Sequence, residues 1–317
     1  MATPFKPQLT TWVLTFSPNG DYDWQATLDG AVAADRAGVD RVGLTGEHVC
    51  FGENLEAYAK PELGGRKGGK QVTGSDGHYI EPMVTMSMIA ARTSRIRFIP
   101  NIMLAALRRP VVLAKMAATL DVLSGGRLDL GVGIGWQREE YQAAGLDFAE
   151  RGRLLDDSLQ VCQLLWHEQR ASHSSPFVSF ENIHMMPKPV DPAGVPVWIS
   201  GTVSNPAMRR LARFGTGWIP WGDAAEGNDE LVDEIPKMRE AVARFGGDPA
   251  RIQVAGNLPL VRDAEGVPQI APTMDRLAPL VEAGVTDFRV MLPTPRDVAA
   301  AEDYLAPWVE AFKAATA

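Results

Sequence analysis

Cysteine is scarce and long apolar runs are absent from this sequence of 317 residues. Cys50 and Cys162 are the only two cysteines and form no metal-ligand spacing, which is typical of a protein from a reducing compartment. No stretch reaches the ~18 consecutive apolar residues that a membrane span requires. The first residues, MATPFKPQLTTW, contain no long apolar run after a basic segment, so no signal peptide is predicted. We therefore expect a cytoplasmic protein that is not embedded in a membrane.

Basic residues are outnumbered by acidic ones. The chain has 31 Lys and Arg against 39 Asp and Glu, a formal net charge of −8. Nucleic acid is not an expected partner, because its phosphate backbone requires a basic surface. A G-x-S-x-G elbow is also missing, which argues against a serine hydrolase. The segment HEQR at 167–170 lacks the second histidine of a zinc helix, and no metal site is predicted.

What the sequence does contain is an alternation of short apolar runs and amphipathic stretches that end in glycine. Alternating strands and helices predict a parallel sheet, and eight such units in this length predict a (β/α)₈ TIM barrel forming a single domain, 1–317. An open, doubly wound sheet is the structural alternative. The expected strands are 9–16, 40–47, 95–104, a segment from 127, 195–201, 217–222, 251–261 and 287–293; the expected helices are 23–38, 81–94, 110–126, helices within 136–168, 205–215, 228–246, 271–284 and 297–314.

Two irregular segments interrupt this alternation. Residues 49–80 follow the second strand, and residues 169–194 precede the fifth, with a possible short hairpin over 177–185. Loops of this length inside a compact domain are usually functional lids or disordered, and we expect substrate specificity to lie in these two insertions. The stretch 60–70 carries four basic residues against one glutamate. It is either a solvated loop or an attractor for an anionic substrate or cofactor tail.

The carboxyl ends of the strands are where a barrel carries its active site. Polar, small or aromatic residues gather at these expected ends, among them Glu47 and His48, Pro100 and Asn101, Gly133 to Trp136, Ser200 to Thr202, Trp221 and Asn257. His48 is the only histidine at an expected strand end, where an imidazole could exchange a proton with a reacting centre; a satisfied, partly buried histidine is the alternative. The other four histidines are expected at the surface.

The segment GVGIG at 131–135 places three glycines where a strand turns into a helix. Close helix–strand packing explains one or two of them. A third, Gly135, suggests backbone amides opening toward a ligand such as a phosphate. The spacing G-x-G-x-G differs from the dinucleotide fingerprint G-x-G-x-x-G, so a dinucleotide-binding fold is not favoured.

The block from 108 to 166, which includes LSGGRLDLGVGIGWQREE, resembles the signature of the bacterial luciferase-like flavin monooxygenases and F420-dependent oxidoreductases. PKPV…VPVWISG (187–201) and RRLARFGTGWIPW (209–221) resemble later blocks of this superfamily. The resemblance spans nearly the whole chain. It implies a (β/α)₈ barrel that binds FMN or F420 at the carboxyl-end rim, and family members often form homodimers.

Site residues follow from this resemblance, position by position. His48 would be the catalytic acid–base group, with Glu47 as the other member of the catalytic pair. A cis peptide is expected at Pro100–Asn101, in support of the cofactor ring. A phosphate-contacting arginine of the family corresponds to Arg151 or Arg153, and the sequence leaves this choice open. The cofactor-binding residues implied are Pro100, Asn101, Gly133, Ile134, Gly135, Trp136, the phosphate-binding turn Gly201, Thr202, Val203 and Ser204, and Trp221.

Two departures from the luciferases favour the F420 branch. Ile134 stands where those enzymes place an arginine, and Val49 follows His48 where they place a second histidine. The first hypothesis is therefore F420-dependent hydride transfer to or from a small organic substrate. The alternative is a monooxygenase that uses O₂ and reduced FMN supplied by a reductase. A barrel aldolase or isomerase would need a lysine or metal carboxylates at the strand ends, and a binding protein would have little need for His48.

Overall fold

Eight parallel strands form the centre of the computed structural model, which describes residues 5–225 and 227–317. Each strand pairs with its neighbour along the chain, and the last pairs with the first. Bridges Phe98–Leu128 and Met103–Val132 join the two remaining ends. The (β/α)₈ barrel is thus confirmed and the open sheet is wrong. The strands are β1 Gln8–Val13, β3 Arg41–Thr45, β5 Arg97–Asn101, β6 Leu130–Val132, β9 Val197–Gly201, β10 Gly217–Pro220, β11 Gln253–Asn257 and β12 Asp287–Val290.

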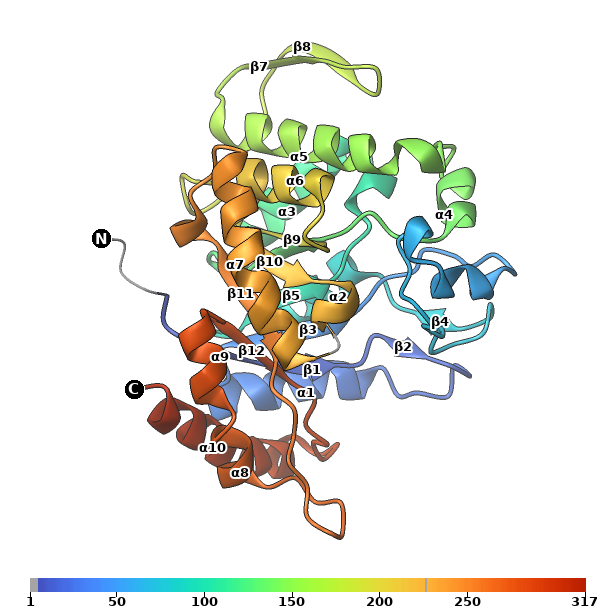
Figure 1. Cartoon of the computed structure of the whole chain (residues 1–317). Coiled ribbons are helices and arrows are strands. Elements are labelled where there is room, and N and C mark those ends of the chain that lie inside the picture. Colours follow the sequence, from blue (N-terminus) through green and yellow to red (C-terminus); the bar gives the residue numbers. More distant parts are fainter. Residues whose placement is uncertain (1–4, 226) are drawn as a thin grey trace.

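Helices surround this ring of strands (Figure 1). The expected helix 271–284 is two short helices, because Pro279 has no amide to donate to the carbonyl of Asp275, where the first helix ends. The helices are α1 Gln25–Ala37, α2 Pro82–Arg92, α3 Pro110–Ser124, α4 Arg138–Ala143, α5 Arg151–His167, α6 Asn205–Phe214, α7 Asn228–Arg244, α8 Ile270–Met274, α9 Leu277–Ala283 and α10 Val298–Ala315.

Both irregular segments contain small strands. Within the first, β4 (His78–Tyr79) pairs with β2 (Phe16–Ser17), which follows β1. Within the second, β7 (Ala171–Ser174) and β8 (Ser179–Ile183) form a hairpin that lies beyond α5 at the top of Figure 1. The hairpin expected over 177–185 was therefore misplaced. Its first strand is the polar stretch ASHS, which carries no apolar alternation and so gave no signal.

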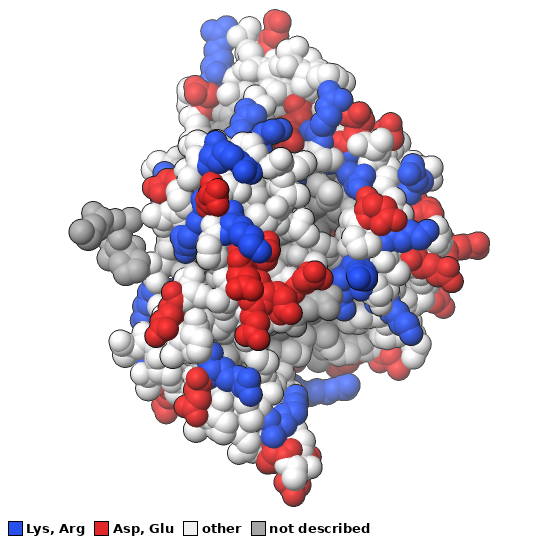
Figure 2. All heavy atoms as spheres, viewed as in Figure 1, with Lys and Arg blue, Asp and Glu red and all other residues white. Residues whose placement is uncertain are grey.

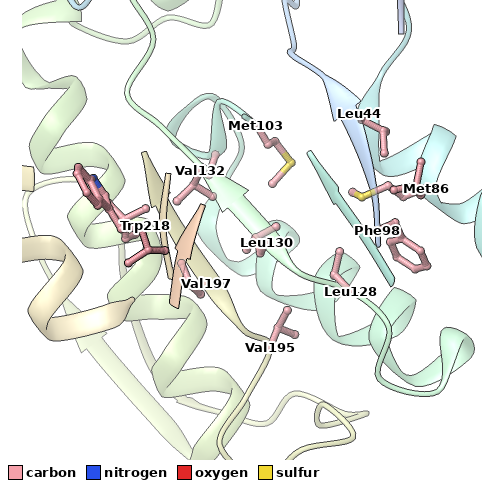
Figure 3. Packing of buried hydrophobic residues seen from close by; sticks show 14 of the residues in the cluster. Leu44, Met86, Phe98, Met103, Leu128, Leu130, Val132, Val195, Val197 and Trp218 are labelled. Atoms are coloured by element: carbon pink, nitrogen blue, oxygen red, sulfur yellow. The ribbon is translucent and has the colours of Figure 1, made fainter. Parts of the chain in front are cut away.

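Alternate residues of each strand face opposite sides of the barrel wall. On the outer side, Leu128, Leu130 and Val132 pack in the main apolar cluster with Phe98 of β5 and Leu44 of β3 (Figure 3). On the inner side, a small separate cluster consists of Ile99, Trp198, Ile219 and Ala255. The barrel strands, which the sequence predicts from short apolar runs, are therefore buried on both faces.

The barrel interior also holds charged side chains. Arg41 donates from Nε to Asp129 Oδ2 at 2.8 Å and from Nη1 to Asp287 Oδ1 at 2.7 Å. Arg97 makes two further bonds to Asp129, and Arg289 donates from Nε to Asp287 Oδ2 at 2.7 Å. Apart from Arg97, these side chains are at most 3% exposed. Burial alone would raise the pKa of both aspartates, but the neighbouring guanidinium groups outweigh it and lower the pKa.

Across the described part of the chain, no helix is both long and apolar enough to cross a membrane.

Candidate functional site

A cleft of about 1120 Å³ lies at the carboxyl ends of the strands. Its walls come from the ends of β3, β5, β6 and β9, from the 49–80 segment, and from the first turns of α5 and α6. The volume is slightly above the range of about 300–1,000 Å³ that is typical of small-molecule and cofactor sites. The predicted site residues that line it are Glu47, His48, Asn101, Gly133, Ile134, Gly135, Trp136, Gly201, Thr202, Ser204 and Trp221.

His48 follows β3 and lies within a group of aromatic rings. Its ring centroid is 4.2 Å from that of Phe51, 5.0 Å from Tyr79 and 5.7 Å from Trp136. Its Nδ1 is 3.4 Å from Glu140 Oε1, which accepts a hydrogen bond from the amide of Val49, and Nδ1 itself has no hydrogen-bond partner. The imidazole is thus mostly buried, lines the cleft and has a carboxylate beside one nitrogen.

Glu47 occupies a different environment from its neighbour. Its Oε2 accepts from the amide of Leu104 at 2.6 Å, and both carboxylate oxygens accept from Arg108, which also pairs with Glu81. Burial alone would lower the pKa of Arg108, but the two glutamates outweigh this effect and raise it. Glu47 is engaged in a buried ion pair that fixes the chain after β5. This ion pair connects the end of β3, next to His48, to the chain that follows β5.

The three glycines of GVGIG have packing reasons. A Cβ at Gly131 would lie 2.1 Å from the carbonyl oxygen of Pro100, and one at Gly133 would lie 2.8 Å from the Ile102 side chain. Gly135 has a φ of +68°, and its Cβ would lie 2.8 Å from Leu104. Packing against backbone requires glycine at Gly131, and the positive φ favours glycine at Gly135, whereas at Gly133 only the end of the Ile102 side chain would have to move. A ligand role for Gly133 and Gly135, which line the cleft, stays a prediction.

The turn at 201–204 leads into α6, and its small residues lie at the cleft wall. Ser204 caps the helix without a side-chain hydrogen bond, so amides of the first turn have no capping partner there. Arg210, in the second turn of this helix, donates to the carbonyl of Gly152 in the first turn of α5 at 2.9 Å, and the first turns of both helices line the cleft. Two helix N-termini meeting at a cleft favour an anionic group.

Arg151 lies at the same place and is the one of the two candidate arginines, Arg151 and Arg153, that lines the cleft. Arg151 lines the cleft, whereas Arg153 is exposed and pairs with Glu150. The Arg151 Nε is buried without a hydrogen-bond partner, and its guanidinium lies 4.0 Å above the Phe148 ring. Burial lowers the pKa of Arg151 from its ordinary value. A half-buried guanidinium whose Nε has no partner fits a phosphate group.

The 49–80 segment forms one wall of the cleft. Tyr58 lies 5.3 Å from Trp136 and 6.3 Å from Trp221, and Trp221 donates from Nε1 to the Gly65 carbonyl at 3.2 Å. Gln137 accepts from the Gly52 amide and donates to the Cys50 carbonyl, both at 2.8 Å. The segment is therefore an ordered cover, fastened to α4 and to the end of β10.

Basic residues of this segment face the cleft. Arg66, Lys67 and Lys70 line it, whereas Lys60 does not. Figure 2 shows that the face turned to the viewer carries both signs of charge, with acidic side chains gathered near its centre. The basic residues are thus a local feature of the cleft edge.

Several predicted positions differ in the structure. The non-proline cis bond joins Asn101 and Ile102, one bond later than predicted, because β5 stays paired with β3 through Asn101. Pro100 and Val203 do not line the cleft: Pro100 is buried in β5, and the Val203 side chain packs against the core.

The 169–194 segment contributes no residue to the cleft lining, so its expected role in specificity has no support. His173 of β7 was expected at the surface, yet its side chain is 7% exposed and its Nε2 lies 2.9 Å from Asp157 Oδ1. This hairpin covers α5 instead of the site.

Three groups near the cleft were missed from sequence: Glu140 beside His48, Arg108 beneath Glu47, and Arg210 between α5 and α6. Glu140 had the clearest signal, because it lies in the first turn of the helix that follows the glycine segment. Among the residues that the structure describes, no three His, Cys, Asp or Glu side chains are grouped so as to hold a metal ion.

Fold and cleft together define a (β/α)₈ barrel with a cofactor-sized site at the mouth. The sequence profile of the family described as "Luciferase-like monooxygenase" matches residues 9–265. The chain belongs to this family, so it is an oxidoreductase of the luciferase-like type, whose members use F420 or FMN.

Relatives agree with this assignment. "Uncharacterized protein Rv0953c" of Mycobacterium tuberculosis (strain ATCC 25618 / H37Rv) is 31% identical over 219 residues, which cover 68% of this chain and 70% of that protein. The fold resembles an "F420-dependent secondary alcohol dehydrogenase" with a TM-score of 0.72, 17% identity, and coverage of 97% of this chain and 99% of the other. It also resembles the FMN-bound oxygenating constituent of 3,6-diketocamphane monooxygenase from Pseudomonas putida, with a TM-score of 0.66, 17% identity, and coverage of 99% and 97%.

Proposed function

We propose that this protein is an F420-dependent oxidoreductase that transfers a hydride to or from a small organic substrate. The observation that carries the proposal is the composition of one cleft. It combines an anion site at two helix N-termini, a row of basic residues, and a histidine held beside a carboxylate.

The anion site suits the phosphate of either candidate cofactor. Amides at the start of α6 and the unused Nε of Arg151 would hold that phosphate. Asn101, Trp136 and Trp221 would lie against the ring system. When bound, reduced F420 supplies a hydride from C5 of its deazaflavin ring.

The basic residues of the 49–80 segment favour F420 over FMN. FMN ends at its phosphate, whereas F420 continues into an acidic glutamate tail. Lys67 and Lys70 at the cleft edge offer charges of the opposite sign to such a tail. The same charges would have no partner in bound FMN.

His48 would donate or accept the proton that accompanies hydride transfer. Glu140 would stabilise the protonated ring through Nδ1 and hold His48 in place. The wall formed by Tyr58, Trp136 and Trp221 would exclude water from the reacting centre. Glu47 and Arg108 would act only by fixing the adjoining backbone.

Separate fluorescence titrations with F420 and FMN test the cofactor. We expect tighter binding of F420, and we expect the Lys67→Gln, Lys70→Gln double variant to lower F420 affinity several-fold, since exposed charge pairs contribute about 0.2–1 kcal/mol each. FMN affinity should change little. Lys60→Gln in the same segment is the matched control, because Lys60 is exposed and outside the cleft lining. Binding of neither cofactor would refute the proposal.

A two-component monooxygenase is the second candidate. The matching profile is described as a monooxygenase family, and the FMN-bound barrel of Pseudomonas putida has a similar fold. This reading requires a partner reductase that supplies reduced FMN. Oxygen consumption with chemically reduced FMN and turnover with reduced F420 under anaerobic conditions separate the two candidates.

A homodimer is proposed on one exposed apolar surface. Val84 and Met88 of α2 are 64% and 50% exposed, and Val112 and Met116 of the adjacent α3 are 53% and 36% exposed. Exposed apolar side chains on two neighbouring helices suit a protein contact. Light scattering should give a dimer mass that Met88→Glu lowers toward the monomer; a monomeric wild-type chain would contradict this.

A further inference from the structure

A second, smaller cavity adjoins the cleft inside the barrel. Its volume is about 110 Å³, roughly that of three to four molecules of liquid water. It shares five lining residues with the cleft: Trp12, Asn101, Ile102, Ser200 and Trp221. The remaining walls come from β10, β11 and β12 and from the 3₁₀ turn Gly222–Ala225. The cavity therefore lies beside the main cleft, on the side of the last strands.

Arg289 is the one charged residue among the described residues that line this cavity. Its side chain is 3% exposed. Its Nε donates to Asp287 at 2.7 Å and its Nη1 to Asn101 Oδ1 at 2.8 Å, but Nη2 has no hydrogen-bond partner. Buried charged donors are rarely left unsatisfied, because water is not there to compensate them.

The charges around Arg289 do not balance. Three guanidinium groups, those of Arg41, Arg97 and Arg289, share two carboxylates, those of Asp129 and Asp287. Burial lowers the pKa of Arg289 despite the nearby Asp287, which indicates that its charge is under-compensated. Positive charge thus exceeds negative charge by one around Arg289, which lines the cavity and has a buried donor, Nη2, without a partner.

We propose that this cavity binds an anionic oxygen group of the substrate, a carboxylate in the simplest case, and that Arg289 Nη2 donates to it. The proposal rests on the proposed function for the reaction that follows, and it narrows the substrates to small acids. A substrate anchored there would extend into the adjoining cleft, past Asn101 and Trp221. The phosphate site at α5 and α6 would remain free for the cofactor.

Acetate and its neutral counterpart acetamide test the subsite on the protein without cofactor. Acetate should bind in the millimolar range, by line broadening of its ¹H signal, and raise the melting temperature, whereas acetamide should bind at least tenfold more weakly. Equal binding of the two would overturn the proposal. Ionic strength is held constant with chloride in both series.

Two variants test separately the contribution of the Arg289 charge and that of the free volume of the cavity. Arg289→Met should weaken acetate at least tenfold and still fold, because it leaves two cations with two carboxylates. Ala225→Leu should also abolish binding by filling the cavity while Arg289 is unchanged. Val72→Leu in the main cleft is the matched control and should bind acetate normally. Acetate affinity that is unchanged in both test variants would overturn the proposal.

The oxygen that accepts a hydrogen bond from Arg289 could instead be a carbonyl oxygen of the bound cofactor. If the substrate occupies the subsite, acetate should bind equally well with saturating F420 or FMN, and Arg289→Met should alter cofactor affinity less than twofold. Loss of acetate binding on cofactor addition, together with weak cofactor binding by Arg289→Met, would assign Arg289 to the cofactor and overturn the proposal. Cofactor titration of the wild-type chain tests the proposed function independently.

Discussion

Replacing Asp129 with asparagine removes one negative charge from the barrel interior and keeps the shape of the side chain. Asp129 accepts from Arg41 at 2.8 Å and from two nitrogens of Arg97 at 2.9 and 2.8 Å, and it is 3% exposed. After the change, Arg41 has only Asp287 as a charged partner, which it must share with Arg289. The surplus of positive charge in the interior rises from one to two.

The expected cost is large because water cannot screen these groups. Removing one partner of a buried ion pair typically destabilises a protein by about 3–5 kcal/mol. The entropy of unfolding scales with chain length, and for 317 residues it is about 0.7 kcal/mol per kelvin. A loss of this size therefore lowers the melting temperature by about 4–8 °C.

Thermal unfolding followed by circular dichroism measures this shift directly. Asp303→Asn on the exposed side of α10 is the control, since surface substitutions usually remain within about 0.5 kcal/mol. A shift for Asp129→Asn no larger than that of the control would refute the reasoning. It would mean that the arginines are not held by Asp129 in solution.

Three further predictions concern the site, the pH dependence and the packing. His48→Ala should slow turnover by about 10²–10⁴-fold with little change in cofactor affinity, whereas the exposed His184→Ala should turn over normally; unchanged turnover of the former would remove its assigned role. Because the guanidinium groups lower the pKa of Asp129 and Asp287, the stability they confer is present above the unfolded-state value and should be lost on acidification below about pH 4; a denaturant midpoint that stays flat from pH 6 to 3 would contradict this. Gly131→Ala should cost about 1–3 kcal/mol, because its Cβ would lie 2.1 Å from a carbonyl oxygen, and equal stability of the Gly131→Ala and wild-type proteins in urea would contradict it.

The barrel could be predicted because its signal is local and repeated. In and just before β6, Leu128, Leu130 and Val132 alternate with residues of the other face, and helix-ending glycines follow α1 and α3. Errors arose where the local pattern was weak. The polar strand β7 has no apolar alternation, and the helix broken before Pro279 was read as continuous.

Most of the candidate site could be located but not resolved into roles. The rule that strand ends meet at one rim brought His48, Asn101 and Trp136 together correctly. It could not show that Glu47 points into a buried pair with Arg108, or that Glu140 is the carboxylate beside His48. Those partners are distant along the chain, so no spacing in the sequence relates them.

Local chemistry in the chain fixes the alternation of strands and helices, the closed barrel and the rim on which the polar residues lie. Which charged side chains pair with one another was decided only by the tertiary structure. Arg41 comes from β3, Asp129 directly precedes β6, and Asp287 and Arg289 belong to β12; they meet because the barrel closes, with Arg41 and Asp287 separated by 246 positions. The unused donor of Arg289 and the cavity beside it exist only in that closed arrangement. Electrostatic energy depends on distance through space, which the order of residues does not specify.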